Sequence, residues 1–98
     1  MLIERKEIKI TIAAGQSYNE VIEVKGINVS IEVVSNQLVN ISISTTNNVI
    51  VAASNNTTSW IWLSQPGDWR IHPVFILTIR NNNSIPANVK IYINQGVM

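Results

Sequence analysis

Apolar and polar residues alternate along most of this chain, and this alternation limits its fold more than any other feature. Side chains two residues apart point the same way in a β-strand, so an alternating segment has one apolar and one polar face. Near the N-terminus, Ile8, Ile10 and Ile12 share one face, and Lys9 and Thr11 share the other. No segment shows the period of a helix. The pattern therefore predicts an all-β fold.

Clusters of turn-forming residues divide the alternating pattern into short segments. We expect about eight short strands, near residues 8–12, 18–24, 29–33, 38–44, 49–53, 60–63, 74–79 and 89–93. Such spacing is typical of an antiparallel β-sandwich of jelly-roll type. We predict a single domain over residues 1–98, in which residues 1–7 form an N-terminal arm.

The expected arm carries charge where the alternation would place apolar residues. Glu4 and Lys6 lie on the same parity as Ile8 and Ile10. This change of register suggests that the arm pairs with the sheet edge of a neighbouring copy.

The middle third of the chain contains no charged residue between Glu32 and Asp68. Segments 49–53, 60–63 and 74–77 are apolar on both faces. Each sheet of a small sandwich has one face open to water, so double-faced strands indicate a surface that something covers. The alternatives are cover by the arm or by the Asn-rich loops, or a middle strand that is fully central.

We expect the covering molecule to be a second copy of the chain or another structural subunit. The residues expected at this contact are Ile50, Trp60, Trp62, Val74 and Ile76. The predicted function is that of a non-enzymatic structural or interaction subunit that self-assembles or packs in a larger shell. A virion coat or surface protein is the concrete expectation, which places the chain on a virion or a cell surface.

Three tryptophans offer an alternative function, which is glycan recognition. Trp60 and Trp62 are two residues apart and share a face of their strand, and Trp69 follows a Pro-Gly turn. Sugar rings stack on exposed indoles, and neighbouring amides bind the hydroxyls. The opposing interpretation is that the rings fill the core or an interface.

Five Asn-x-Ser/Thr sequons could carry glycans. They begin at Asn28, Asn40, Asn55, Asn56 and Asn82. An Asn-rich and Ser/Thr-rich chain also generates such triplets by chance.

The sequence contains no pattern of catalytic or metal-binding residues. There is no cysteine and one histidine, His72, so zinc and iron sites are not expected. His72 and Asp68 could be imagined with a serine as a hydrolytic triad, but no G-x-S-x-G motif occurs. We predict no enzyme activity, no catalytic residue, no metal and no cofactor.

Charge and hydropathy exclude two further kinds of partner. The net charge is +1 with 13% charged residues, against about 25% in typical domains, and nucleic-acid binding needs clustered Lys and Arg. No apolar run approaches the ~18 residues of a membrane helix, and the N-terminus lacks the apolar core of a signal peptide. We expect no nucleic acid, no membrane span and no signal peptide in this chain.

The order of turns and strands resembles GOLD-type and related accessory β-sandwich modules. The likeness rests on the Ala-Gly-Gln-Ser turn at 14–17 with segments 22–26, 29–31 and 39–41, and on segments 67–69, 75–82 and 89–93 near the end. In these modules an Asn commonly follows the penultimate strand. The resemblance implies a non-catalytic, jelly-roll-like module used for protein contacts. This chain has no attached coiled coil, anchor or enzyme domain, so no trafficking or protease-accessory role is expected. Its size and its Ile- and Asn-rich composition are also similar to small structural proteins of viruses that infect archaea.

Overall fold

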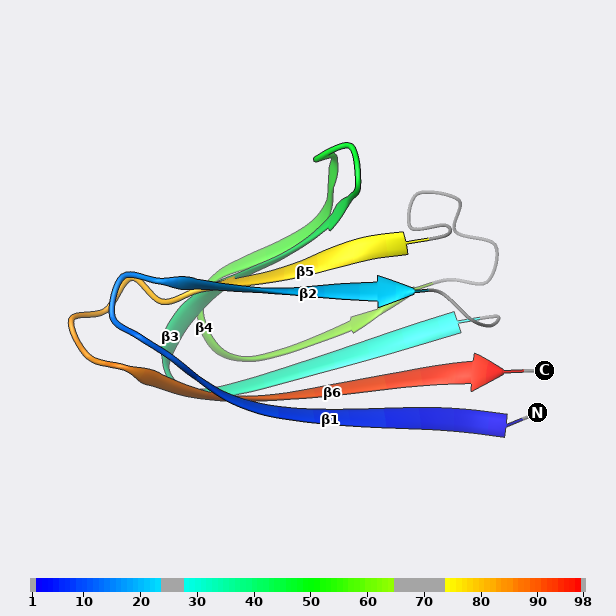
Figure 1. The fold of residues 1–98 in the computed structure, drawn as a ribbon, viewed down its shortest axis with the longest axis horizontal. Coiled ribbons are helices and arrows are strands. Elements are labelled where there is room, and N and C mark those ends of the chain that lie inside the picture. The colour runs from blue at the N-terminus through cyan, green and yellow to red at the C-terminus, as the bar shows by residue number, and fades with distance from the viewer. Residues whose placement is uncertain (1, 24–27, 65–73, 98) are drawn as a thin grey trace.

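A computed structural model describes residues 2–23, 28–64 and 74–97 of the chain. The strands in these residues are β1 (Leu2–Ile12), β2 (Ser17–Glu23), β3 (Asn28–Thr45), β4 (Ile50–Leu63), β5 (Val74–Arg80) and β6 (Ala87–Val97). They form one antiparallel sheet in the order β1-β6-β3-β5-β2, and β4 pairs with the other edge of β3 (Figure 1). The predicted all-β class is confirmed.

The strand β3 is long enough to belong to both halves of a curled sheet. Its residues 28–35 pair with β6, its residues 40–45 pair with β5, and β4 follows along its other side. The sheet therefore forms a half-barrel (Figure 1). We call β1, β6, the first part of β3 and the last part of β4 the first wall. The second wall consists of β2, β5, the last part of β3 and the first part of β4.

Two segments expected to separate strands instead bend them. The turn predicted at residues 35–37 lies within β3, where side chains supply local hydrogen bonds. Ser35 Oγ accepts from the Gln37 backbone N at 3.1 Å, and Asn36 Oδ1 accepts from the Asn88 backbone N at 2.8 Å. These bonds let the chain change partner from β6 to β5 without ending the strand.

The same happens in β4, opposite the bend of β3. The loop expected at residues 54–59 lies within β4, with register shifts against β3 and a positive φ of 52° at Asn56. The Asn56 backbone N donates to Asn40 Oδ1 at 2.9 Å. The predicted number of eight strands is not confirmed, because two pairs of expected strands among the described residues are the halves of β3 and β4. One curled sheet of six strands stands where a two-sheet sandwich was expected.

Residues 2–7 belong to β1, and no separate arm is seen there. They pair with residues 97–92 of β6 in a continuous register. Of the charges that suggested an arm, Lys6 pairs with Glu20 of β2, as described below.

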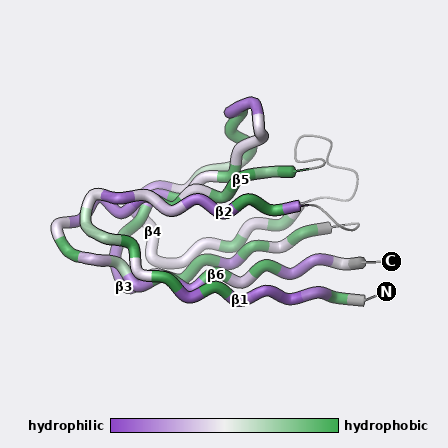
Figure 2. The backbone as a smooth tube through the Cα atoms, viewed as in Figure 1, coloured by the Kyte–Doolittle hydropathy of each residue, from purple (hydrophilic) through white to green (hydrophobic). Residues whose placement is uncertain are grey.

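The apolar residues of both walls meet in one core between them. Figure 2 shows the alternation of hydropathy along the strands that produces it. The buried apolar residues include Ile31, Val33, Val89, Ile91 and Ile93 from the first wall, and Ile22, Ile41, Ile43, Phe75, Leu77 and Ile79 from the second. In β1, β2, β3 and β6 the apolar parity is the one that the structure buries, whereas in β5 the segment expected to be apolar on both faces buries Phe75, Leu77 and Ile79.

A buried asparagine joins the turn between β1 and β2 to the loop after β5. The side chain of Asn81 is fully buried, and its Nδ2 donates to Ile12 O at 3.0 Å and to Ile85 O at 2.9 Å. Its Oδ1 accepts from the Asn83 backbone N at 3.0 Å, and its backbone N donates to Gln16 O at 2.9 Å. These contacts of Asn81 therefore hold the closed end of the half-barrel.

Candidate functional site

Three strands have an edge that pairs with no other strand among the described residues, namely β1, β2 and β4. An unpaired edge can accept a strand of another chain, and proteins commonly protect such edges with inward-pointing charges. The side chains at each edge therefore indicate which one is available for contact.

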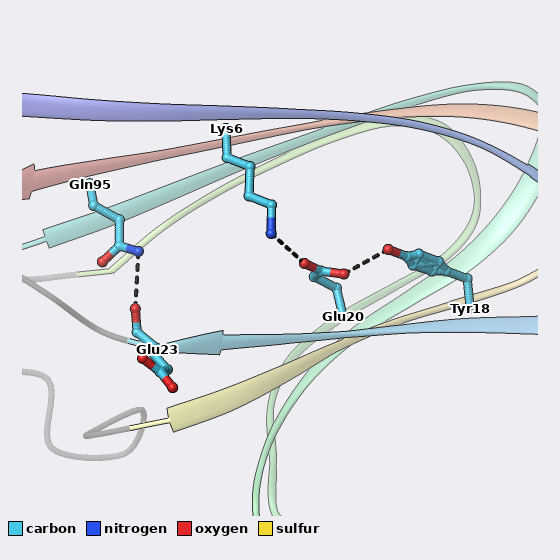
Figure 3. A network of polar contacts seen from close by, with 5 residues as sticks. All are labelled: Lys6, Tyr18, Glu20, Glu23 and Gln95. Atoms are coloured by element: carbon cyan, nitrogen blue, oxygen red, sulfur yellow. Dashed lines mark hydrogen bonds and ion pairs between the residues drawn. The ribbon is translucent and has the colours of Figure 1, made fainter.

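Polar side chains join β1 and β2 across the open side of the half-barrel. Lys6 lies opposite the buried Ile93, and Glu20 opposite the buried Leu77, so both side chains are directed inward. Lys6 Nζ and Glu20 Oε1 form an ion pair at 2.9 Å (Figure 3). The Tyr18 hydroxyl donates to the other carboxylate oxygen of Glu20 at 2.6 Å. The edges of β1 and β2 thus carry charges that satisfy each other.

A second contact and a cleft lie beside this network. Gln95 Nε2, from the first wall, donates to Glu23 O of β2 at 3.0 Å (Figure 3). A cleft of about 620 Å³ is lined by residues 4–6 of β1, residues 20–23 of β2, and Ile93 and Gln95 of β6. Its ionisable lining combines two basic and three acidic side chains, so it favours neither anions nor cations strongly.

The pKa values of Glu20 and Tyr18 are moved away from neutral pH. Burial raises the pKa of Glu20, but hydrogen bonds from Tyr18 and Lys6 and the charge of Lys6 outweigh it and leave that pKa below its usual value. The hydrogen bond to Glu20, burial and the Glu20 charge together raise the pKa of Tyr18 to about 12. A general acid or base works best with a pKa near the operating pH. The network is therefore suited to joining two walls and poorly suited to proton transfer.

The edge of β4 has a different character. None of the fourteen residues of β4 is charged. Ile50, Ile61 and Leu63 point outward and are 65%, 63% and 63% exposed. Among the open edges of the described residues, β4 is the one without a charged side chain.

The outward apolar side chains of β4 lie on both walls. Ile61 and Leu63 are on the outer surface of the first wall. On the second wall, Ile50 and Ile76 both lie opposite Ser44 in the sheet. Ile76 and Val74 are half-buried. Three of the five residues predicted at a contact, Ile50, Val74 and Ile76, thus face away from the core, and their role in a contact stays a prediction.

The other two predicted contact residues, Trp60 and Trp62, face inward. Each pairs with a buried residue of β3, is half-buried, and packs against the core. The Trp62 ring meets the Phe75 ring of the second wall edge to face, with centroids 5.9 Å apart and an interplanar angle of 63°. These rings therefore support the packing of the walls. Trp69, the third residue of the predicted glycan platform, lies outside the described residues.

The sequons differ in how their asparagines are placed. Asn55, Asn56 and Asn82 are exposed, whereas Asn40 is half-buried. Asn28 begins β3, and its side chain lies outside the described residues. Glycosylation of any of them stays a prediction.

His72 and Asp68, the residues considered for a hydrolytic triad, also lie outside the described residues. In the ranges that the structure covers, no cluster of three or more His, Asp or Glu side chains could hold a metal ion. Those ranges likewise hold no helix of the length and hydropathy needed to cross a membrane.

No protein-family model matches the chain, and no characterised protein matches its sequence. Solved structures with a similar fold include the Yersinia pseudotuberculosis-derived mitogen, with a TM-score of 0.69 and 11% identity over 97% of this chain and 88% of that one. A de novo designed double-stranded β-helix has a TM-score of 0.59 and 15% sequence identity. That match covers 90% of this chain and 97% of the designed protein. PliG of Aeromonas hydrophila, a periplasmic inhibitor of g-type lysozyme, has a TM-score of 0.55 and 9% sequence identity. That match covers 91% of this chain and 85% of PliG. At these identities the likeness shows the fold alone. None of the three is a GOLD-type module or a viral structural protein, so both resemblances stay predictions.

The ion pair between Lys6 and Glu20 was missed by the sequence analysis, although a signal for it exists. Lys6 lies on the apolar parity of β1, and Glu20 lies on the same parity as Tyr18 and Ile22 in β2. A charged residue on an inward face needs a partner or an edge position. Lys6 and Glu20 have opposite charges and lie on the inward parity of two different strands. Their pairing therefore indicates that the edges of these two strands face each other.

Proposed function

We propose that this protein is a non-enzymatic structural or interaction subunit that self-assembles through β4. One observation carries the proposal: among the described residues, β4 has an open, uncharged edge with exposed apolar side chains, while the open edges of β1 and β2 carry charges that pair with each other. An edge left without protection is the natural place for a partner strand.

The energetics favour assembly that depends on concentration. Complete burial of an aliphatic side chain contributes ~1.5–3 kcal/mol. Ile61 and Leu63 are 63% exposed, so complete cover of both side chains on two copies would contribute at most roughly 4–8 kcal/mol, and edge pairing covers only part of each side chain. Association costs about 4–15 kcal/mol in lost freedom. The free energy gained from burying these apolar side chains is thus comparable to the lower end of the association cost. Hydrogen bonds along the edge, or many simultaneous contacts, would strengthen the assembly.

A shell is an arrangement in which many weak contacts act together. A virion coat or surface component is the concrete form that we propose for such a subunit. The finer fold assignment belongs to the same proposal, and the likeness to a designed double-stranded β-helix supports treating the two walls as a jelly-roll-type unit.

Light scattering after size-exclusion chromatography tests the proposal, with loading concentrations from micromolar to millimolar. We expect the apparent mass of the wild type to rise with concentration, and Ile61→Lys to suppress that rise. Ile3→Lys is the matched control, because Ile3 is 67% exposed and lies on the opposite edge of the first wall, on β1. A wild-type mass that stays monomeric throughout, or an equal effect of both variants, would refute assembly through β4.

A further inference from the structure

The sequence at the open edge of β4 is nearly a palindrome. Around Ile61 it reads Thr-Ser-Trp-Ile-Trp-Leu-Ser over residues 58–64. In a two-fold contact the same surface is used by both copies, so a self-pairing strand must be compatible with its own reverse. A pair centred on Ile61 sets each Trp60 opposite the Trp62 of the second copy.

The backbone of this segment is directed correctly for such pairing. The Ser64 backbone N donates to Val29 O of β3 at 2.9 Å. In an antiparallel ladder, successive residues direct their backbone groups alternately to one side and to the other. Ser64 directs its backbone groups toward β3, so Trp62 and Trp60 do the same. The backbone groups of Ile61 and Leu63 are then directed toward the open edge. Ile61 and Leu63, whose side chains are exposed, therefore also direct their backbone groups toward an edge that pairs with no strand among the described residues.

The charge pattern selects a second copy as the occupant. When a strand pairs antiparallel with itself, a charged residue near the axis comes close to its own copy, and like charges that are directly opposite destabilise a sheet. β4 has no charge that could act in this way. The open strands β1 and β2 do carry charge, including Lys6 and Glu20.

We infer that β4 pairs antiparallel with β4 of a second copy about a two-fold axis at Ile61. This inference rests on the proposed function and names the contact through which the subunits assemble. The first walls of the two copies form one continuous sheet. Ser59 lies opposite the Leu63 of the second copy, and the four tryptophans form two cross-strand pairs on the inner face. Cross-strand aromatic pairs are among the contacts that stabilise antiparallel sheets.

Disulfide trapping tests the register, because the chain has no native cysteine. Hydrogen-bonded partners in an antiparallel pair have Cα atoms about 5.5 Å apart, within the range of about 4.4–6.8 Å that a disulfide needs. Ile61→Cys should therefore form a covalent dimer under mild oxidation. Ser59→Cys alone should not, because two copies of residue 59 lie four residues apart, about 14 Å. A mixture of tagged Ser59→Cys with untagged Leu63→Cys should give the mixed dimer. Ile3→Cys serves as the control for random collision.

Each outcome decides the question. Cross-linking of Ile61→Cys and of the Ser59/Leu63 mixture, with neither Ser59→Cys alone nor Ile3→Cys linked, supports the inferred register. If the wild type assembles in solution while Ile61→Cys stays reduced or links no faster than Ile3→Cys, the register is wrong and the proposed function stands. If the wild type stays monomeric at every concentration and Ile61→Cys does not link, both the inference and the proposed function fail.

Discussion

Replacing Asn81 with alanine should destabilise the fold more than any change at a neighbouring asparagine. The side chain is fully buried, and its Nδ2 donates to the carbonyls of Ile12 and Ile85, while its Oδ1 accepts from the Asn83 backbone N. A buried polar group left without its partner costs roughly 1–3 kcal/mol. The Ile12 bond is buried, and the other two are partly buried and can recover bonds to water. We therefore expect a loss of about 3–5 kcal/mol.

This loss is a large part of the total stability. Domains of this size have a free energy of unfolding of about 5–15 kcal/mol, and 1 kcal/mol shifts Tm by roughly 4–8 °C. We expect Tm of Asn81→Ala to fall by about 12–40 °C. Urea unfolding followed by tryptophan fluorescence and by circular dichroism gives the free energy, and an unchanged slope against urea shows that the transition is still two-state.

Asn82→Ala is the matched control, since Asn82 is exposed and accepts a hydrogen bond from Arg80 Nε at the surface. Its effect should stay within about 0.5 kcal/mol. Asn81→Asp keeps the shape but replaces the donating Nδ2 with an oxygen that faces carbonyl oxygens, so it should be at least as harmful as alanine at neutral pH. A loss below about 1 kcal/mol for Asn81→Ala, or an equal loss for Asn82→Ala, would refute the role given to this residue.

Four further predictions concern Trp62, the polar network of Glu20 and Tyr18, and the sequons. Trp62→Ala should cost up to about 3–5 kcal/mol in urea unfolding, the upper value being that of a fully buried aromatic, because Trp62 is half-buried. Glycan binding that is lost in a variant of unchanged stability would contradict the inward placement of Trp62. Because the pKa of Glu20 is lowered, its contribution is present above its unfolded pKa and is lost as pH falls through the folded value, so Glu20→Gln should flatten the acid side of the stability profile. Because the pKa of Tyr18 is raised from 10.0 to about 12, its contribution is present below pH 10 and is lost as pH rises toward 12; Tyr18→Phe should remove that loss, and an unchanged alkaline profile would argue against the bond to Glu20. In a host that glycosylates, intact-mass analysis should show a glycan at the exposed Asn55 before the half-buried Asn40.

The sequence predicted the faces of the strands better than their ends. Parity alone identifies Ile31, Val33, Ile41 and Ile43 as inward residues of β3, because a period of two leaves only one choice once a face is apolar. It does not show that the polar segment at 35–37 continues the strand. That outcome depends on the bond from the Asn88 backbone to Asn36, and these residues are 52 positions apart in the chain. A local cluster of Ser, Asn and Gln predicts a turn, and it contains no information about a hydrogen-bond partner as distant as Asn88.

The candidate site was only partly accessible from the sequence for a related reason. The lack of charge between Glu32 and Asp68 is visible in the residues. Its meaning depends on which strand has an open edge, and the order β1-β6-β3-β5-β2 with β4 outside cannot be read from local pattern. Trp60 and Trp62 were expected at a contact because segment 60–63 is apolar on both faces, and parity could not say that the tryptophans lie on the inner one. The pairing of both with buried residues of β3 decides that question.

The distribution of charge over the open edges connects the fold to the proposed function. A half-barrel cannot close its sheet, so it keeps unpaired edges that any exposed strand could join. At the mouth, Lys6 and Glu20 turn inward and hold β1 and β2 together, which makes these two edges poor acceptors for another chain. The same protection would be available to β4 through a single lysine at an exposed position such as Ile61, at little cost to the fold because that side chain is outside the core. Its absence over all fourteen residues of β4 distinguishes this edge from the other two. An edge that is easy to protect and remains unprotected is the one that we expect to be used.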